Sequence, residues 1–215
     1  MKPLSRLPLL ACLLALGNAA ALPMTLTTLS GVTTLSGTVA GWTLGQRTVA
    51  FLDGSPARVL TSGTIDARGR FRVTLPTPAQ LVGLTARAGD RYDVVGCDDQ
   101  PSDYNVSGRE VELYDLPALK VLKPIASKAA AGRASYEARS LQNLTSAGEV
   151  TLMYASDYAA VAVNVTCPSF GSMRTVVFDL KLAPGWNAVF SRAGRDTYIE
   201  NAAPGLSSRW VYSAR

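Results

Sequence analysis

The chain has 215 residues, a formal net charge of +5 and no histidine. The absence of histidine excludes the commonest general base, the commonest metal ligand and every serine or cysteine triad built on imidazole. Neither a Ser-x-x-Lys nor a Gly-x-Ser-x-Gly motif is present to replace such a triad. We therefore expect a protein that is not an enzyme.

Residues 1–21 have the features of a secretory signal peptide. Lys2 and Arg6 precede an apolar run over residues 7–16, and three alanines at 19–21 suit cleavage by signal peptidase. The apolar run is too short to span a bilayer core of roughly 30 Å. We expect an extracytoplasmic protein, periplasmic or secreted, with no transmembrane segment once the leader is removed.

The three cysteines have different expected roles. Cys12 ends a Leu-Leu-Ala-Cys sequence that resembles a bacterial lipobox, so a lipid anchor there is an alternative to free release. The apolar run continues beyond Cys12, which favours cleavage after residue 21. Cys97 and Cys167 then remain as a pair, and an oxidising compartment favours a disulfide between them. Closing a loop of about 70 residues would contribute roughly 4 kcal/mol of stability. The alternative is two separately buried thiols.

After the leader, the chain alternates short strands with turns. Gly37 to Leu52 predicts two strands, and the segment from Thr61 to Pro76 predicts the clearest hairpin. Its turn is Asp-Ala-Arg-Gly at 66–69, where Asp hydrogen-bonds back to the backbone and Gly tolerates a positive φ. The strand that follows alternates apolar and polar residues, as expected when one face is wet.

Residues 37–76 resemble the transthyretin-like or carboxypeptidase-regulatory-like β-sandwich domains. In those families an opening Gly-x-Val strand precedes an Asp-x-x-Gly-x-Phe hairpin. The matching residues are Gly37, Val39, Asp66, Gly69 and Phe71. The resemblance covers about forty residues and implies a fold rather than an activity, and no ligand residue of those families transfers to a numbered position.

An acidic stretch follows in the region of Cys97. Closely spaced oxygen donors there suit calcium, the possible cofactor, and the candidate ligands are Asp98, Asp99, Asp103 and Asn105. The spacing does not match an EF-hand, and a solvated acidic loop is the alternative. Glu110 and Glu112, on one face of a strand, are a candidate carboxylate pair for glycan hydrolysis, although a wet strand face also explains them.

The distribution of strands predicts an all-β protein with two consecutive antiparallel β-sandwich-like domains. We place the domains at residues 22–120 and 141–215, with a linker or short helix over 121–140. In the second domain, strands are predicted over 150–154, 159–166, 175–182, 187–191, 198–202 and 208–212. Pro184-Gly185 predicts a hairpin turn, with Trp186 just beyond it.

Near the C-terminus, arginines alternate with aromatic residues, a mixture that binds sugars or acidic polymers by stacking and charge. The candidate ligand-binding residues are Arg192, Arg195, Tyr198, Arg209, Trp210 and Tyr212. Packing of Trp210 and Tyr212 into the core is the alternative. Nucleic acid is disfavoured because removing Lys2 and Arg6 leaves 19 basic against 16 acidic residues.

The sequence thus predicts an exported, non-catalytic binding or structural module of the cell envelope. Its expected partner is an envelope protein or a surface polysaccharide. A carboxylate-dependent glycan hydrolase and a purely structural envelope protein are the alternatives.

Overall fold

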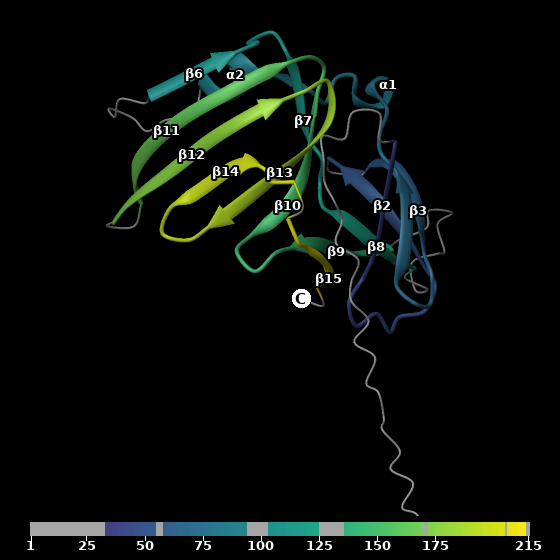
Figure 1. Cartoon of the computed structure of the whole chain (residues 1–215). Coiled ribbons are helices and arrows are strands. Elements are labelled where there is room, and N and C mark those ends of the chain that lie inside the picture. Colours follow the sequence, from purple (N-terminus) through teal and green to yellow (C-terminus); the bar gives the residue numbers. More distant parts are fainter. Residues whose placement is uncertain are drawn as a thin grey trace, which may run out of the picture.

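The structure is a computed structural model that describes residues 33–54, 58–93, 103–124, 136–169, 172–204 and 206–213. The predicted signal peptide lies outside these residues and remains a prediction. The described chain is mostly β, with two short helices, and all its strands belong to one large mixed sheet (Figure 1). The expected β class is therefore confirmed.

One part of this sheet closes into a ring, here called the barrel. In ring order its strands are β1 (Thr34–Thr38), β4 (Arg70–Thr74), β3 (Arg58–Ile65), β2 (Arg47–Asp53), β8 (Leu119–Pro124), β9 (Tyr136–Leu144) and β15 (Arg209–Tyr212). Each strand pairs antiparallel with the next. Val39 closes the ring by a parallel bridge to Trp210, and the Ala40 N–H donates to the Trp210 carbonyl at 3.0 Å. The last strand of the chain thus completes the barrel that the first described strand begins.

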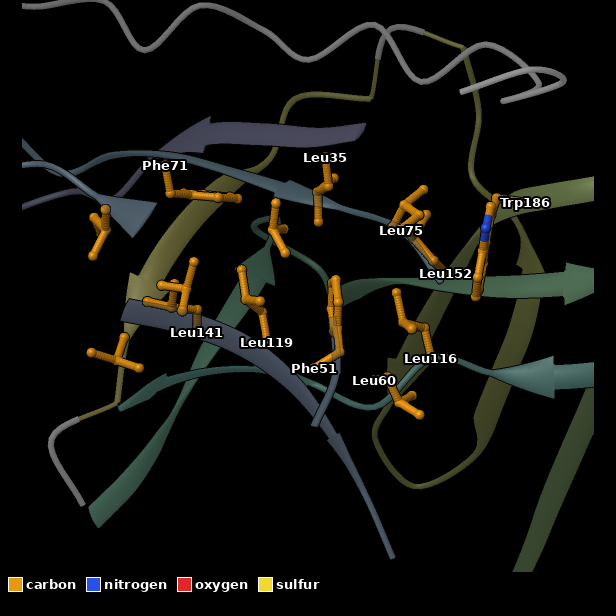
Figure 2. Close-up of a cluster of buried hydrophobic side chains, with 14 of the residues drawn as sticks. Leu35, Phe51, Leu60, Phe71, Leu75, Leu116, Leu119, Leu141, Leu152 and Trp186 are labelled. Atoms are coloured by element: carbon orange, nitrogen blue, oxygen red, sulfur yellow. The ribbon is translucent and has the colours of Figure 1, made fainter. Parts of the chain in front are cut away.

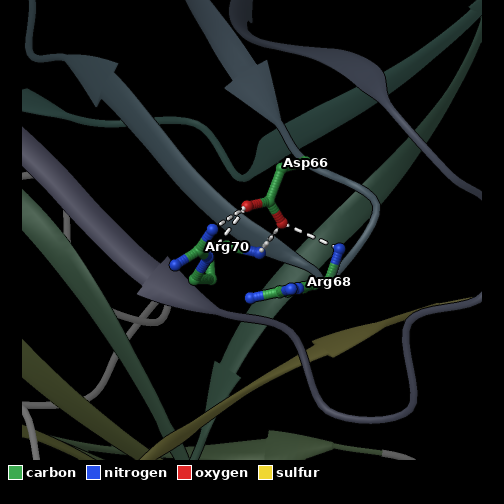
Figure 3. Close-up of polar contacts among 3 residues, drawn as sticks. All are labelled: Asp66, Arg68 and Arg70. Atoms are coloured by element: carbon green, nitrogen blue, oxygen red, sulfur yellow. Dashed lines mark hydrogen bonds and ion pairs between the residues drawn. The ribbon is translucent and has the colours of Figure 1, made fainter.

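The hairpin between β3 and β4 is confirmed, and its turn has the predicted chemistry (Figure 3). One carboxylate oxygen of Asp66 accepts from the backbone N–H groups of Arg68 and Arg70, at 2.8 and 3.0 Å. Gly69 has φ +79°, and a Cβ there would lie 2.7 Å from the Cβ of Trp42. The turn therefore needs Gly69 for its backbone conformation and for space.

The other part of the sheet, here called the second sheet, has the short helix α2 (Ala88–Asp93) beside it, whereas the short helix α1 (Pro78–Leu81) lies against β3 of the barrel. Its strands in order are β5 (Ala86–Arg87), β7 (Glu112–Asp115), β10 (Glu149–Ala155), β13 (Gly185–Ala193), β14 (Thr197–Asn201), β12 (Ser172–Leu182), β11 (Ala159–Ser169) and β6 (Asp103–Ser107). Tyr92 of α2 packs edge-on against Phe178, with ring centroids 5.1 Å apart. The helix α2 thus contributes to the core on the inner face of this sheet.

The predicted hairpin from β12 into β13 is wrong, because β14 lies between these strands. β14 pairs antiparallel with β13 and parallel with β12. Asn187 holds the corner that redirects the chain: its amide donates to the carbonyls of Ala183 and Gly185, and its oxygen accepts from the Ala183 N–H. Asn201 then ties β14 to β12, accepting from the Lys181 N–H and donating to the Lys181 carbonyl.

The predicted linker also differs from the structure where it is described. Residues 121–124 and 136–140 belong to β8 and β9, which pair with each other, and residues 125–135 lie outside the described part. Within β8, Leu119 and Val121 are buried in the core. These two apolar residues are separated by a lysine and lie close to an alanine-rich stretch, so the sequence gives only a short alternating pattern. A short strand between polar neighbours carries a weak pattern.

Strands on either side of the predicted domain boundary pair with each other. β6 pairs with β11, and β7 pairs with β10. The division into two consecutive sandwich-like domains remains a prediction that these pairings do not by themselves decide.

Two main hydrophobic clusters underlie the two parts of the sheet. The cluster inside the barrel includes Phe51, Phe71 and Leu141, and it extends to Leu152 and Trp186 of the second sheet (Figure 2). The other cluster lies on the inner face of the second sheet and includes Val161, Val163 and Leu180. Across the described residues, no helix is long and apolar enough to cross a membrane.

Candidate functional site

The best candidate site is an open hollow of about 470 Å³ on the second sheet. The lining residues come from three adjacent strands: Asn105 of β6, residues 162–164 of β11 and residues 177–179 of β12. Its size lies within the range of small-molecule and cofactor sites, roughly 300–1,000 Å³. A second hollow, beside the barrel, has a volume of only about 40 Å³ and is too small for an organic ligand.

The hollow is part of what we call the outer face of the second sheet. Side chains alternate across a strand, and Val161, Val163 and Leu180 point into the core, so their neighbours point outward. The outer face includes Asn105, Ser107, Ala160, Ala162, Asn164, Val177, Asp179, Lys181, Arg192, Tyr198 and Glu200, and also Phe190, which lies opposite Glu200 and is buried. Most of these residues are exposed and polar.

Two rows of residues cross this face from strand to strand. In one row, Asn164 of β11 lies opposite Val177 of β12, which lies opposite Tyr198 of β14. Tyr198 lies opposite Arg192 of β13 and so ends the row. In the second row, Ala162 lies between Asn105 and Asp179, and Glu200 follows.

Arg192 and Tyr198 form a stacked pair at the end of the first row. The guanidinium carbon of Arg192 lies 4.7 Å from the centroid of the Tyr198 ring. Tyr198 remains 36 % exposed. A cation over an aromatic ring is attracted by the ring's negative face and restrains the ring's position. The pair therefore presents a fixed and accessible aromatic surface.

The backbone beneath the face is held by side-chain hydrogen bonds. The carboxylate of Asp196, in the turn between β13 and β14, accepts from the Thr175 N–H at 2.9 Å. Thr166 and Thr175 join β11 to β12 through their hydroxyl groups, 3.1 Å apart. These bonds, with the Asn201 bonds to Lys181, fix the relative positions of the strands that carry the site.

The predicted ligand-binding residues divide into two groups. Arg192 and Tyr198 lie on the outer face, and Arg195 lies exposed in the turn that joins their strands. Arg209, Trp210 and Tyr212 belong instead to β15 of the barrel. Trp210 packs edge-on against Phe71, and Tyr212 against Trp42, at centroid distances of 5.0 and 5.7 Å. Trp210 and Tyr212 therefore pack against the core, which was the alternative to a role in ligand binding.

The predicted calcium ligands are described only in part. Asp98 and Asp99 lie outside the described residues. Asp103 is the first residue of β6, opposite Asn164 in the register, and Asn105 lies on the outer face. The described residues contain no group of three or more His, Cys, Asp or Glu side chains that could hold a metal ion. The calcium site remains a prediction.

Glu110 and Glu112 occupy different kinds of position. Glu110 lies in the turn before β7, and its carboxylate forms an exposed ion pair with Arg87 at 3.1 Å. Glu112 is the first residue of β7, and its backbone N–H donates to the Ser156 hydroxyl at 2.9 Å. The two residues do not share a strand in the way that the sequence suggested.

Cys167 is disulfide-bonded and lies partly buried in β11, opposite Arg174. Cys97 lies outside the described residues. The pairing of Cys97 with Cys167 therefore remains a prediction.

The sequence named Arg192 and Tyr198 as candidate ligand-binding residues, but it did not name most of the residues that lie beside them on the outer face. Asn164, Asp179 and Glu200 were not singled out, because only the pairing of β11, β12 and β14 places them together. The one signal in the sequence is that Asn164 and Asp179 each lie between two apolar residues within a strand, and that Glu200 follows the apolar Ile199.

Comparison with known proteins found no family model, no curated protein and no solved structure that matches this chain. The function must therefore be argued from the site itself.

Proposed function

We propose that this protein is an exported, non-catalytic binding module of the cell envelope, and that its outer face binds a surface polysaccharide with little net charge. The observation that carries the proposal is the accessible Arg192–Tyr198 stack beside the hollow. An aromatic ring with a polar edge offers a sugar both an apolar surface and a hydrogen-bonding group.

The polar groups around the ring suit hydroxyl-rich ligands. A sugar hydroxyl both donates and accepts hydrogen bonds, and so do the carboxamides of Asn105 and Asn164. The carboxylate of Asp179 accepts, and the ammonium group of Lys181 donates. Because these side chains lie on neighbouring strands, about 4.8 Å apart, they offer a polymer repeated contacts across the sheet.

The balance of charge argues against an acidic polymer. The outer face carries two carboxylates, Asp179 and Glu200, and two cations, Lys181 and Arg192. One of the cations is already stacked on Tyr198. Polyanions need a surface dominated by positive charge, so a polymer without dense negative charge fits this face better.

Export is part of the same proposal. It is supported by the basic residues Lys2 and Arg6, the short apolar run and the alanines at 19–21. It is also supported by the disulfide at Cys167, because disulfides persist mainly outside the reducing cytosol.

The test is co-sedimentation of the purified protein with insoluble cell-envelope polysaccharide, using two single variants. Tyr198→Ala removes the stacking surface and should reduce the bound fraction at least tenfold. Tyr158→Ala is the matched control, since Tyr158 is 73 % exposed but lies in the turn between β10 and β11 and does not line the hollow. It should bind like the wild type.

Other outcomes would point to other functions. Capture of one envelope protein by crosslinking in cells, with no polysaccharide bound, would replace the polymer by a protein partner. The absence of any partner would favour a purely structural role. The glycan-hydrolase alternative receives no support from the placement of Glu110 and Glu112.

A further inference from the structure

Two buried asparagines differ in how their polar atoms are satisfied. Asn143 and Asn187 are 3 % and 2 % exposed and are the buried polar residues of the described chain. Asn187 uses both ends of its amide, within the corner between β12 and β13. The side-chain oxygen of Asn143 is buried and has no hydrogen-bond partner. A buried acceptor without a hydrogen-bond partner lowers the stability of the folded protein by about 1–3 kcal/mol.

Asn143 lies where β9 changes its neighbour. On one side, β9 pairs with β8 up to Leu141, opposite Leu119, and with β10 at Leu144, opposite Glu149. Neither Gln142 nor Asn143 has a strand partner on this side within the described pairings. A backbone N–H or C=O group of these two residues that points to this side has no strand partner in the described pairings, and buried backbone groups need partners.

The smaller hollow occupies this gap. Its volume is about 40 Å³, and it is lined by Asn143, by residues 116–119 between β7 and β8, by residues 149–152 of β10, and by core side chains of the barrel that include Trp210. A cavity needs roughly 10–15 Å³ of this measure to hold a water molecule, so at least one water fits. Cavities that stay empty are apolar throughout, and this one contains a buried carboxamide oxygen.

We propose that this cavity is an internal hydration site in which a buried water donates a hydrogen bond to the Asn143 side-chain oxygen. The water also lies between β9 and the segments that line the cavity opposite Asn143, so that it joins the barrel to β10. The ligand is water because the volume is too small for an organic molecule.

The first test is a high-resolution crystal structure of the full mature chain. We expect ordered water within about 2.7–3.2 Å of the Asn143 side-chain oxygen. An empty cavity, or a protein donor bonded to that oxygen, would overturn the proposal. This measurement needs no variant, so it decides the question even if substitutions impair folding.

The second test counts long-lived waters in solution by oxygen-17 magnetic relaxation dispersion. Asn143→Leu keeps the size of the side chain but removes the acceptor, and it should lower the count by at least one water. Tyr158→Ala, far from this gap in the register, should leave the count unchanged. An unchanged count in the folded Asn143→Leu protein would contradict the inference.

Discussion

Trp210 of β15 packs edge-on against Phe71 of β4, with ring centroids 5.0 Å apart and ring planes at 84°. Gly37 of β1 makes room for this contact, because a Cβ there would lie 2.6 Å from the Trp210 ring. Together with the backbone bridge from Val39, the two rings close the barrel between its first and last strands. The C-terminal strand is therefore part of the core rather than an appendage.

Replacing the Trp210 side chain should destabilise the folded protein. We expect Trp210→Ala to lower the free energy of unfolding by about 2–3 kcal/mol, less than the usual cost of about 3–5 kcal/mol for a fully buried aromatic side chain, because Trp210 is only partly buried. Urea denaturation followed by circular dichroism measures the change. Tyr158→Ala, at an exposed position, should change stability by no more than about 0.5 kcal/mol. Equal stabilities of the Trp210→Ala variant and the wild type would show that β15 does not close the barrel.

Replacing Asn187, which holds the corner between β12 and β13, should also destabilise the protein. Asn187→Ala removes the hydrogen bonds to Ala183 and Gly185 and leaves buried backbone groups without partners. We expect a loss of about 2–4 kcal/mol, since each net bond contributes about 1 kcal/mol and each orphaned group costs more. Thermal unfolding of the variant measures this loss. A loss below about 0.5 kcal/mol would mean that the corner is held in another way.

Asp66 should make the protein sensitive to acid. The hydrogen bond from the Arg70 backbone N–H is the main cause that lowers the pKa of Asp66 below its ordinary value of 3.8, and the Arg70 guanidinium adds to it. Because the folded pKa is the lower one, the stabilisation is present above pH 3.8 and is lost as the pH falls through the folded value.

The check is the melting temperature of Asp66→Asn against the wild type between pH 7 and pH 2. The variant should melt lower at neutral pH, and the difference should shrink in acid. Added salt should also shrink the difference at neutral pH, because Asp66 and Arg70 are exposed. A difference that does not change with pH would rule out the ion pair and the carboxylate as its source.

Glu149 should behave in the opposite way. Burial raises the pKa of Glu149 above its ordinary value of 4.5, so its ionised form is disfavoured in the folded state. The contribution of Glu149 to the free energy of unfolding is most favourable below pH 4.5, and it is lost as the pH rises through the pKa that Glu149 has in the folded state. Glu149→Gln should therefore match the wild type in acid and melt at a higher temperature at pH 7. A lower melting temperature of the variant at pH 7 would contradict this account.

The sequence predicts local structure better than long-range pairing, for a physical reason. The turn at 66–69 was predictable because Asp66 and Gly69 specify it by themselves. The strands of the second half were predictable from alternation, and β10, β11 and β12 include the expected ranges. Alternation does not say which strands are neighbours, so the insertion of β14 between β12 and β13 was missed.

The same limit applies to the candidate site. Arg192 and Tyr198 could be singled out because charge and aromatic residues alternate in one short segment. Asn164 and Asp179 join them only through the register of β11, β12 and β14. Trp210 and Tyr212 show the same sequence pattern as Tyr198, but their strand lies against the barrel core. Composition identifies the residue types, and the pairing of strands decides which of them are accessible.

The most direct test of the outer face as a binding surface is a titration of the isotope-labelled protein with soluble oligosaccharides from the cell envelope, followed by amide NMR. We expect the amide shifts to be concentrated at Asn105, Asn164, Asp179, Arg192 and Tyr198, and to be lost in Tyr198→Ala. Amide shifts confined to the barrel, or no shifts with any of the oligosaccharides from the cell envelope, would contradict the proposal that the outer face is the binding surface.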